Sequence, residues 1–288
     1  VMNAGYNASY GNNLDITIAP RASMSSPNTN PGDVLFNYEK SSAFSRFHAG
    51  TLRLNKRLSG GMAMGANYQY SHSIDNAGSV GGTSTVVAQN WQDLLAEEAN
   101  SSFDQRHRVS GTYIYELPFG QDKRWFTTRK SAQIFEGFSV SGSFGFATGT
   151  PLTPHYAASI TDVSNGTAGT LRPNNVAGVP PSAGAGSLTR WFNPAAYTQP
   201  VADSYGNAFG NVSRNSITGP GTITNNMSLS KTMQLGDTRS MEIRATAGNV
   251  FNTVQYSGVD TSLTSLTAGQ VISAASMRSF SFNARFRF

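Results

Sequence analysis

Cysteine is absent from the 288-residue sequence, which excludes disulfides, thiolate metal sites and a cysteine nucleophile. The sequence also lacks an apolar run of the roughly 18 residues that a transmembrane helix requires, so no such helix is expected. Charged residues make up only 13% of the chain and hydrophobic residues 38%, both low for a globular domain. The net charge is +5, yet no basic cluster is longer than Lys123-Arg124 or Arg129-Lys130, so nucleic-acid binding is not expected.

The sequence is rich instead in glycine and aromatic residues, with 29 Gly, 17 Phe and 11 Tyr. Its final stretch, residues 279–288, alternates between apolar and polar side chains. A period of two places the apolar side chains on one face of a strand and the polar ones on the other. The apolar positions are Phe280, Phe282, Ala284, Phe286 and Phe288, and the polar positions include Arg285 and Arg287.

Such a strand fits two environments. In a soluble sheet the apolar face packs on a core, and in an outer-membrane barrel it meets lipid while the polar face meets a wet lumen. The aromatic residue Phe288 at the end of the strand favours the second environment. Together with Phe280, Phe282 and Phe286, it is similar to the C-terminal assembly signal of bacterial outer-membrane barrels.

Seven earlier stretches repeat the alternation, so about eight strands are expected. They span residues 3–10, 43–58, 62–74, 105–117, 135–147, 222–235, 239–251 and 279–288. Short turns (59–61 and 236–238) and an intermediate segment (118–134) join strands on one side. Long loops join them on the other, at 11–42, 75–104, 148–221 and 252–275. This asymmetry predicts an all-β fold, a transmembrane antiparallel up-and-down β-barrel with short periplasmic turns and long extracellular loops.

Local features add smaller expectations. The prolines at 20, 27 and 31 argue against central strands within residues 11–42, and residues 91–99 could form a short helix. Lys56 and Lys231 fall on apolar faces near the short-turn ends, where a lysine can extend to the lipid headgroups. Four tyrosines could belong to aromatic girdles: Tyr68, Tyr70, Tyr113 and Tyr115.

Short motifs recur in a fixed order along the chain. In the first half they are Phe47-His48-Ala49, Leu54-Asn55-Lys56-Arg57-Leu58-Ser59-Gly60-Gly61, Asn67-Tyr68-Gln69-Tyr70-Ser71, Ile74-Asp75, Phe103-Asp104-Gln105-Arg106-His107-Arg108 and Leu117-Pro118-Phe119-Gly120. In the second half they are Gly149-Thr150-Pro151-Leu152-Thr153-Pro154, Trp191-Phe192-Asn193-Pro194-Ala195-Ala196-Tyr197, Gly210-Asn211-Val212-Ser213-Arg214-Asn215, Gly219-Pro220-Gly221 and Asn249-Val250-Phe251-Asn252. In this order and spacing, the chain from residue 44 onward resembles the C-terminal barrel of TonB-dependent outer-membrane transporters. The resemblance is to the Oar-like branch, whose members often carry an N-terminal carboxypeptidase-regulatory-like domain.

The resemblance implies a location in the bacterial outer membrane and energised import of a bulky nutrient such as a saccharide, a peptide or a chelate. The implied partners are outer-membrane lipid, the barrel-assembly machinery, a plug domain and, through the plug, TonB. Plugged transporters have about 22 strands, whereas this sequence has about eight and no plug. Residues 1–288 are therefore expected to be the C-terminal segment of a longer barrel. Two alternatives stay open: a complete eight-stranded barrel acting as an anchor or adhesin, and a soluble, secreted β-sandwich.

Two groups of residues are candidates for contact with cargo. Seven arginines on polar faces could guide an anionic or polar substrate, or could belong to a hydrated wall paired with carboxylates such as Glu116 and Glu242. They are Arg53, Arg57, Arg106, Arg108, Arg244, Arg285 and Arg287. The loop aromatics Trp191, Phe192 and Tyr197 could bind a ligand at the outer mouth, or could pack the long loop on itself.

No catalytic residue, metal or other cofactor is expected, and the chain is not expected to be an enzyme. The four histidines lack the paired spacing typical of a metal site. The stretch Ser228-Leu229-Ser230-Lys231 matches the S-x-x-K motif in letters. On a strand, however, Ser228 and Lys231 point to opposite faces, so a serine nucleophile and its base could not meet.

Overall fold

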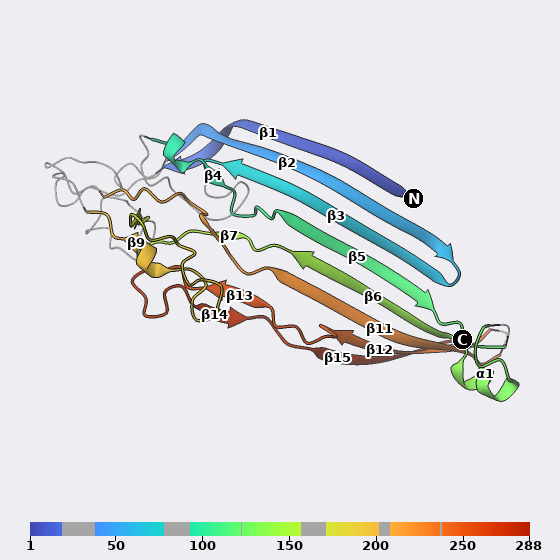
Figure 1. Cartoon of the computed structure of the whole chain (residues 1–288). Coiled ribbons are helices and arrows are strands. Elements are labelled where there is room, and N and C mark those ends of the chain that lie inside the picture. Colours follow the sequence, from blue (N-terminus) through green and yellow to red (C-terminus); the bar gives the residue numbers. More distant parts are fainter. Residues whose placement is uncertain (19–37, 78–92, 122, 157–170, 202–207, 237) are drawn as a thin grey trace.

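The computed structural model describes residues 1–18, 38–77, 93–121, 123–156, 171–201, 208–236 and 238–288. Their main feature is one antiparallel sheet in which each long strand pairs with the next along the chain (Figure 1). The strands are β1 (Met2–Ile18), β2 (Tyr38–Ser59), β3 (Met62–Asp75), β5 (His107–Glu116), β6 (Phe138–Ala147), β11 (Thr222–Gln234), β12 (Ser240–Gly248) and β15 (Ser279–Arg287). The short β4 (Ala99–Asn100) pairs with the end of β3. The predicted up-and-down order of eight strands is confirmed.

The two edges of this sheet are β1 and β15. In the described part of the chain these two strands do not pair with each other, so the eight strands form an open wall. An unpaired strand edge leaves backbone N–H and C=O groups without partners, and in lipid each such group costs several kcal/mol. In a membrane, both edges would therefore need partners beyond the pairing seen in this sheet.

The two ends of the wall differ, as the connection lengths predict. At the end that we call the turn end, Gly60 and Gly61 reverse the chain between β2 and β3 with φ values of 62° and 78°, which glycine adopts without strain. The helix α1 (Arg129–Phe135) lies at the same end, as does the C-terminus (Figure 1). The opposite end, which we call the loop end, carries the long connections and their small elements.

The register aligns the apolar side chains across the wall. Leu52 on β2 lies opposite Tyr68 on β3, which lies opposite Val109 on β5. The row continues through Phe146 on β6 to Ile223 on β11. A slip of one residue at any pairing would move a strand's apolar side chains to the other face. The predicted faces therefore agree from strand to strand.

The apolar face is exposed. Leu54, Ile223 and Phe282 retain 43%, 43% and 77% of their accessible surface, and the described residues place no second sheet over them. The large buried hydrophobic side chains lie instead at the loop end, in clusters around Phe192, Ile16 and Leu171. A β-sandwich would bury one face of the sheet in a core, so this arrangement speaks against the soluble alternative.

Several predicted boundaries are wrong, for local reasons. β1 continues to Ile18 and β2 begins at Tyr38, inside the predicted loop 11–42, because Leu14 and Ile16 continue the alternation past a bulge. Asn13 at this bulge has a φ of 53°, a conformation that asparagine tolerates. The prolines at 20, 27 and 31 lie outside the described residues.

The predicted loops also contain elements that the periodicity did not indicate. In place of the possible helix at 91–99, of which residues 91 and 92 lie outside the described residues, the described part holds one 3₁₀ turn, η2 (Leu95–Glu97). The segment 118–134 leads into α1, which ends before Gly137 with its φ of 80°, a common helix stop. The later loops hold β7 (Pro151–Leu152) paired with β10 (Ile217–Thr218), β8 (Asn174–Asn175) paired with β9 (Tyr197–Thr198), η3 (Pro194–Ala196), and the hairpin β13 (Tyr256–Val259) and β14 (Val271–Ala274).

Candidate functional site: a polar wall and its linked loops

The polar face of the wall is built mainly from small hydroxyl and amide side chains. Ser139 on β6 and Ser230 on β11 lie 2.8 Å apart between their hydroxyl oxygens. Ser228 and Thr246 make the same contact between β11 and β12 at 2.9 Å. Such cross-strand hydroxyl pairs satisfy part of each group's hydrogen bonding and leave the rest for water. This face is thus suited to a hydrated lumen.

A cluster of charged residues interrupts this face near the turn end. Arg244 donates to Glu242 Oε1 through Nη2 at 2.6 Å and through Nε at 3.1 Å. Arg285 lies directly opposite Glu242 across the β12–β15 pair, and Arg287 lies opposite Ser240. The cluster borders an open pocket of about 570 Å³ lined by Glu242, Arg244, Arg285 and their neighbours. Three guanidinium groups against one carboxylate leave it with an excess of positive charge.

The other predicted lumen arginines are dispersed. Arg53 lies between Asn3 and Asn67 in the register and is exposed, and Arg57 lies exposed near the Gly60 turn. Arg108 lines a second pocket of about 340 Å³ at the loop end. Arg106 precedes β5, and its Nε lies 3.2 Å from Asp104 Oδ2. The structure thus gathers Arg244, Arg285 and Arg287 but not the remaining four, and a role for the seven in guiding cargo stays a prediction.

Two levels of tyrosine border the apolar face. Tyr68 and Tyr70 lie toward the loop end, where the Tyr68 hydroxyl is 2.9 Å from His107 Nδ1, and Tyr115 lies toward the turn end, opposite Met62. Tyr70 is opposite His107, so the levels are separated along β5 by residues 107–115, about 27 Å at ~3.4 Å per residue. The lipid-facing band of an outer-membrane barrel is about 25 Å tall and is flanked by aromatic girdles. Because barrel strands are tilted by about 35–45°, the roughly 27 Å along β5 corresponds to about 19–22 Å along the membrane normal, close to the height of this band.

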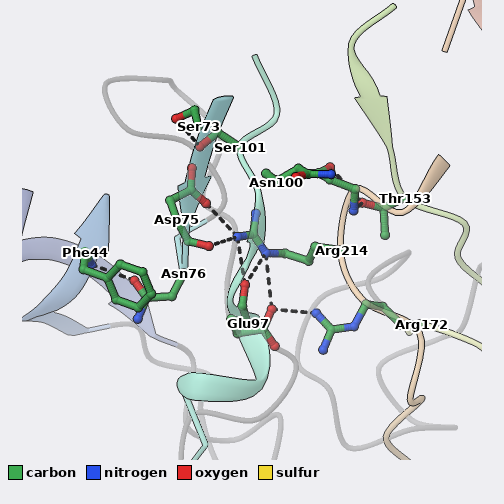
Figure 2. A network of polar contacts seen from close by, with 11 residues as sticks. Phe44, Ser73, Asp75, Asn76, Glu97, Asn100, Ser101, Thr153, Arg172 and Arg214 are labelled. Atoms are coloured by element: carbon green, nitrogen blue, oxygen red, sulfur yellow. Dashed lines mark hydrogen bonds and ion pairs between the residues drawn. The ribbon is translucent and has the colours of Figure 1, made fainter. Parts of the chain in front are cut away.

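At the loop end, a buried ionic network joins two long connections (Figure 2). Arg214 Nη2 donates to Asp75 Oδ1 at 2.7 Å and to the carbonyl oxygens of Asp75 and Glu97, each at 3.0 Å. Arg172 Nη1 donates to Glu97 Oε2 at 2.6 Å. The four side chains are between 1% and 8% exposed. Because a buried charge is costly unless it is paired and hydrogen-bonded, these four residues hold one another in place.

Further polar contacts extend this link. Asn215 donates through Nδ2 to the Asn100 carbonyl at 2.6 Å, and its backbone N–H donates to Thr153 Oγ1 at 2.9 Å. The hydroxyl groups of Ser73 and Ser101 lie 2.8 Å apart. Segments that are more than a hundred residues apart in sequence therefore meet over the end of β3, as Figure 2 shows.

The loop aromatics form the core of the longest connection. Phe192 is 2% exposed and Tyr197 6% exposed, and their rings meet edge to face at 5.9 Å in a cluster with Ala196, Val212 and Ile217. Burial raises the pKa of the Tyr197 hydroxyl, against a smaller opposing effect of a hydrogen bond with Ser216. Trp191 is half-buried and donates from Nε1 to the Thr218 carbonyl at 2.8 Å. The rings of Phe192 and Tyr197 thus pack the loop, and ligand binding by these three residues stays a prediction.

Sequence reasoning did not single out Arg172 and Arg214. A signal was present, because the segment 75–104 holds Asp75, Asp93, Glu97, Glu98 and Asp104 but no lysine or arginine. An acidic segment that becomes buried needs cations from another part of the chain. The alternation that identifies strands contains no information on which loop supplies them.

The described residues include no group of three metal-ligating side chains close enough to hold an ion. They also include no helix that is both long and apolar enough to cross a membrane.

Outside the strands, burial pushes the pKa of the Asp260 carboxyl upward, but hydrogen bonds from Ser265, Thr267 and the Ser262 amide outweigh burial and leave this pKa below its ordinary value.

Comparisons with known proteins extend these observations. The family described as "Outer membrane beta barrel domain" matches residues 2–281. Among solved structures, the chain is similar to the outer membrane transporter YddB from Escherichia coli, with a TM-score of 0.53 and 10% sequence identity. That alignment covers 100% of this chain and 30% of the transporter, so the chain spans less than a third of the transporter's length. No curated protein matches the sequence.

Proposed function

Because the chain belongs to the outer membrane beta-barrel domain family, we propose that it forms part of the wall of a TonB-dependent transporter of the bacterial outer membrane. The protein lies in that membrane, as the family and the transporter-like fold indicate. The observation that carries the proposal is that all eight strands align, in order, with less than a third of an outer membrane transporter. The unpaired edges of β1 and β15 in the described sheet support it, because strands from the rest of a larger barrel would pair with both.

The proposed cargo is a bulky hydrophilic nutrient such as a saccharide, a peptide or a chelate. The hydroxyl-lined polar face would give it a wet path, and the excess positive charge of Arg244, Arg285 and Arg287 around Glu242 favours cargo with an anionic group. The loops joined by Arg214 and Glu97 would form the outer mouth. In this proposal the turn end faces the periplasm, where a plug domain and TonB would act.

The C-terminal strand has a separate proposed role. Phe280, Phe282, Phe286 and Phe288 are all more than half exposed, and Phe286 stacks on Phe288 with ring centroids 6.2 Å apart. Exposed aromatics on an edge strand form a surface that another protein can recognise through the free backbone edge. We propose that the barrel-assembly machinery binds this edge during insertion.

Transport can be tested by nutrient depletion. Cells of the source bacterium, a strain lacking this gene and a strain lacking TonB are grown with a mixture of oligosaccharides, peptides and metal chelates, and the medium is followed by mass spectrometry. The proposal predicts that one nutrient class persists in the medium of both mutant strains. Depletion that continues without TonB but stops without this gene would refute TonB dependence. Unchanged depletion combined with loss of surface attachment would favour the anchor or adhesin alternative.

A further inference from the structure

A second surface of the chain lies at the turn end, in the connection between β5 and β6. It combines exposed aromatic and aliphatic side chains with four cations, and we call it the basic-aromatic cap. Its apolar members are Trp125, Phe126, Ile134 and Phe135, which are 52%, 42%, 59% and 36% exposed. Its cations, also exposed, are Lys123, Arg124, Arg129 and Lys130. The transport proposal uses none of these residues.

The cap has a defined structure. Phe126 stacks on Phe135 with centroids 4.2 Å apart and meets Phe119 edge to face at 5.0 Å. Phe126 has a φ of 59°, which is unfavourable for a bulky residue and is offset here by the two ring contacts. The Arg124 guanidinium lies 5.5 Å from the Trp125 ring centre. These contacts hold the rings together while leaving their outer surfaces exposed.

The cap continues the lipid-facing side of the wall. Lys231 and Phe138 lie opposite each other on the apolar faces of β11 and β6, and the Lys231 ammonium lies 5.2 Å from the Phe138 ring centre. The same ammonium donates to the carbonyl of Ile134 in α1. Lys231, which was expected to extend to headgroups, thus ties α1 to the apolar face at the turn end, where that face meets the membrane surface.

Two of the cap's cations lie at the start of α1. Arg129 and Lys130 occupy the first turn of the helix, which contains no acidic residue. Cations are disfavoured at this end because the helix dipole is positive there. Both cations are exposed, so a negatively charged surface outside the protein could approach them directly.

We propose that the basic-aromatic cap binds the headgroups of anionic phospholipids in the membrane leaflet at the turn end. Aromatic rings prefer the headgroup level of a bilayer, and helices with basic and apolar side chains lie in the interface and are attracted to anionic lipid. The four cations complement the phosphates, and the exposed rings and Ile134 enter the adjacent apolar layer. Bound lipid would fix the depth of the wall in the membrane at this end.

Site-specific cross-linking tests the assignment in the full protein. Trp125 is replaced by the photoreactive residue p-benzoylphenylalanine, and the protein is purified from outer membranes. It is then reconstituted in vesicles of phosphatidylethanolamine with phosphatidylglycerol as the minor component. The cross-linked lipid is identified by mass spectrometry after illumination. The proposal predicts a phosphatidylglycerol share well above its mole fraction in the vesicles.

Charge removal then tests the cause. The R129Q/K130Q pair is expected to lower the preference for phosphatidylglycerol roughly fivefold for each charge removed. R278Q is the matched control, because Arg278 also lies beside an aromatic ring, 5.4 Å from the centre of the Phe280 ring, but at the loop end. The R278Q variant should show the same preference for phosphatidylglycerol as the parent protein.

A second measurement needs no further variant. Raising the salt concentration from 0.1 M to 1 M shortens the screening length from about 10 Å to about 3 Å, so the preference should fall toward the vesicle composition. The proposal is overturned if the cross-linked lipids match the vesicle composition in low salt. It is also overturned if R129Q/K130Q leaves the preference unchanged, or if cross-links in native outer membranes go to a polypeptide instead of lipid.

Discussion

Replacing Arg214 by glutamine should release the loop end while leaving the wall intact. Among the described residues, the Asp75 carboxylate has Arg214 as its one ion-pair partner, and it is 1% exposed. The Arg214 side chain also supplies hydrogen bonds to the carbonyls of Asp75 and Glu97. Glu97 keeps its 2.6 Å pair with Arg172. The variant therefore leaves the Asp75 carboxylate without this ion pair, removes the 3.5 Å ion pair of Arg214 with Glu97, and leaves two carbonyl groups short of donors.

The expected magnitude follows from this count. Removing one partner of a buried ion pair costs about 3–5 kcal/mol, which corresponds to a roughly hundredfold to several-thousandfold increase in local opening. Apart from Asp75 at the end of β3, the long strands do not share the network, because their hydrogen bonds form a separate ladder from β1 to β15. Hydrogen exchange should therefore become faster in residues 93–106 and 208–218 and stay unchanged in β5, β6 and β11.

Hydrogen exchange measured by mass spectrometry on the detergent-solubilised protein checks this prediction. The matched control is R244Q, which breaks an ion pair of 2.6 Å at the polar face, close to the 2.7 Å of the Arg214–Asp75 pair, with the Arg244 side chain 48% exposed. An exposed pair contributes about 1 kcal/mol or less. The double variant D75N/R214Q should recover part of the protection, because it no longer leaves a charge buried without a partner. Unchanged exchange at the loop end in R214Q, or equal loss in the strands, would refute the reasoning.

Three further predictions concern single positions. Gly137→Ala should destabilise the protein by about 1–3 kcal/mol more than Gly178→Ala, as measured by the midpoints of urea unfolding. Both glycines have φ near 80°, but a Cβ at 137 would lie 2.2 Å from the Thr232 carbonyl oxygen, whereas a Cβ at 178 would meet nothing within 4 Å. Phe192→Ala should lower the stability of the loop by about 3–5 kcal/mol and speed proteolysis between residues 171 and 201. Leu188→Ala, at a position 46% exposed, should change neither the stability of the loop nor its rate of proteolysis. Asp260 has a lowered folded pKa, so its carboxylate stabilises the β13–β14 hairpin above the unfolded pKa, and this contribution is lost as the pH falls through the folded pKa. Exchange within residues 256–274 should therefore rise more steeply on acidification in the parent protein than in D260N, and equal pH profiles would contradict the assignment.

The alternating sequence was sufficient to predict the wall. Residues such as Leu52, Phe146 and Phe282 alternate with polar neighbours, and a period of two specifies both the strand and its face. The order of strands followed from connection lengths, since neighbouring antiparallel strands are joined by turns or loops. The extension of β1 past Asn13 was missed because the prolines further along the predicted loop outweighed the shorter alternation from Leu14 to Ile18.

The loop end could not be predicted in the same way. Asp75 and Arg214 are separated by 139 residues, and no local period relates the two positions. The pairs β7–β10 and β8–β9 consist of two residues per strand, too few for a periodic signal. Helix α1 offered a weak signal, with Thr128 before it and Gly137 after it, but its seven residues lie within a segment that composition marks as a connection.

The size of the polypeptide in the outer membrane tests the central claim most directly. An antibody raised against residues 171–201 is used to detect the protein in denatured outer-membrane fractions. If the chain forms part of the wall of a larger transporter, the band should have a mass of roughly three times the 30.7 kDa of this sequence or more, because this chain covers 30% of the similar transporter. A band near 30.7 kDa would mean that the eight strands act alone, and the transporter proposal would have to be abandoned.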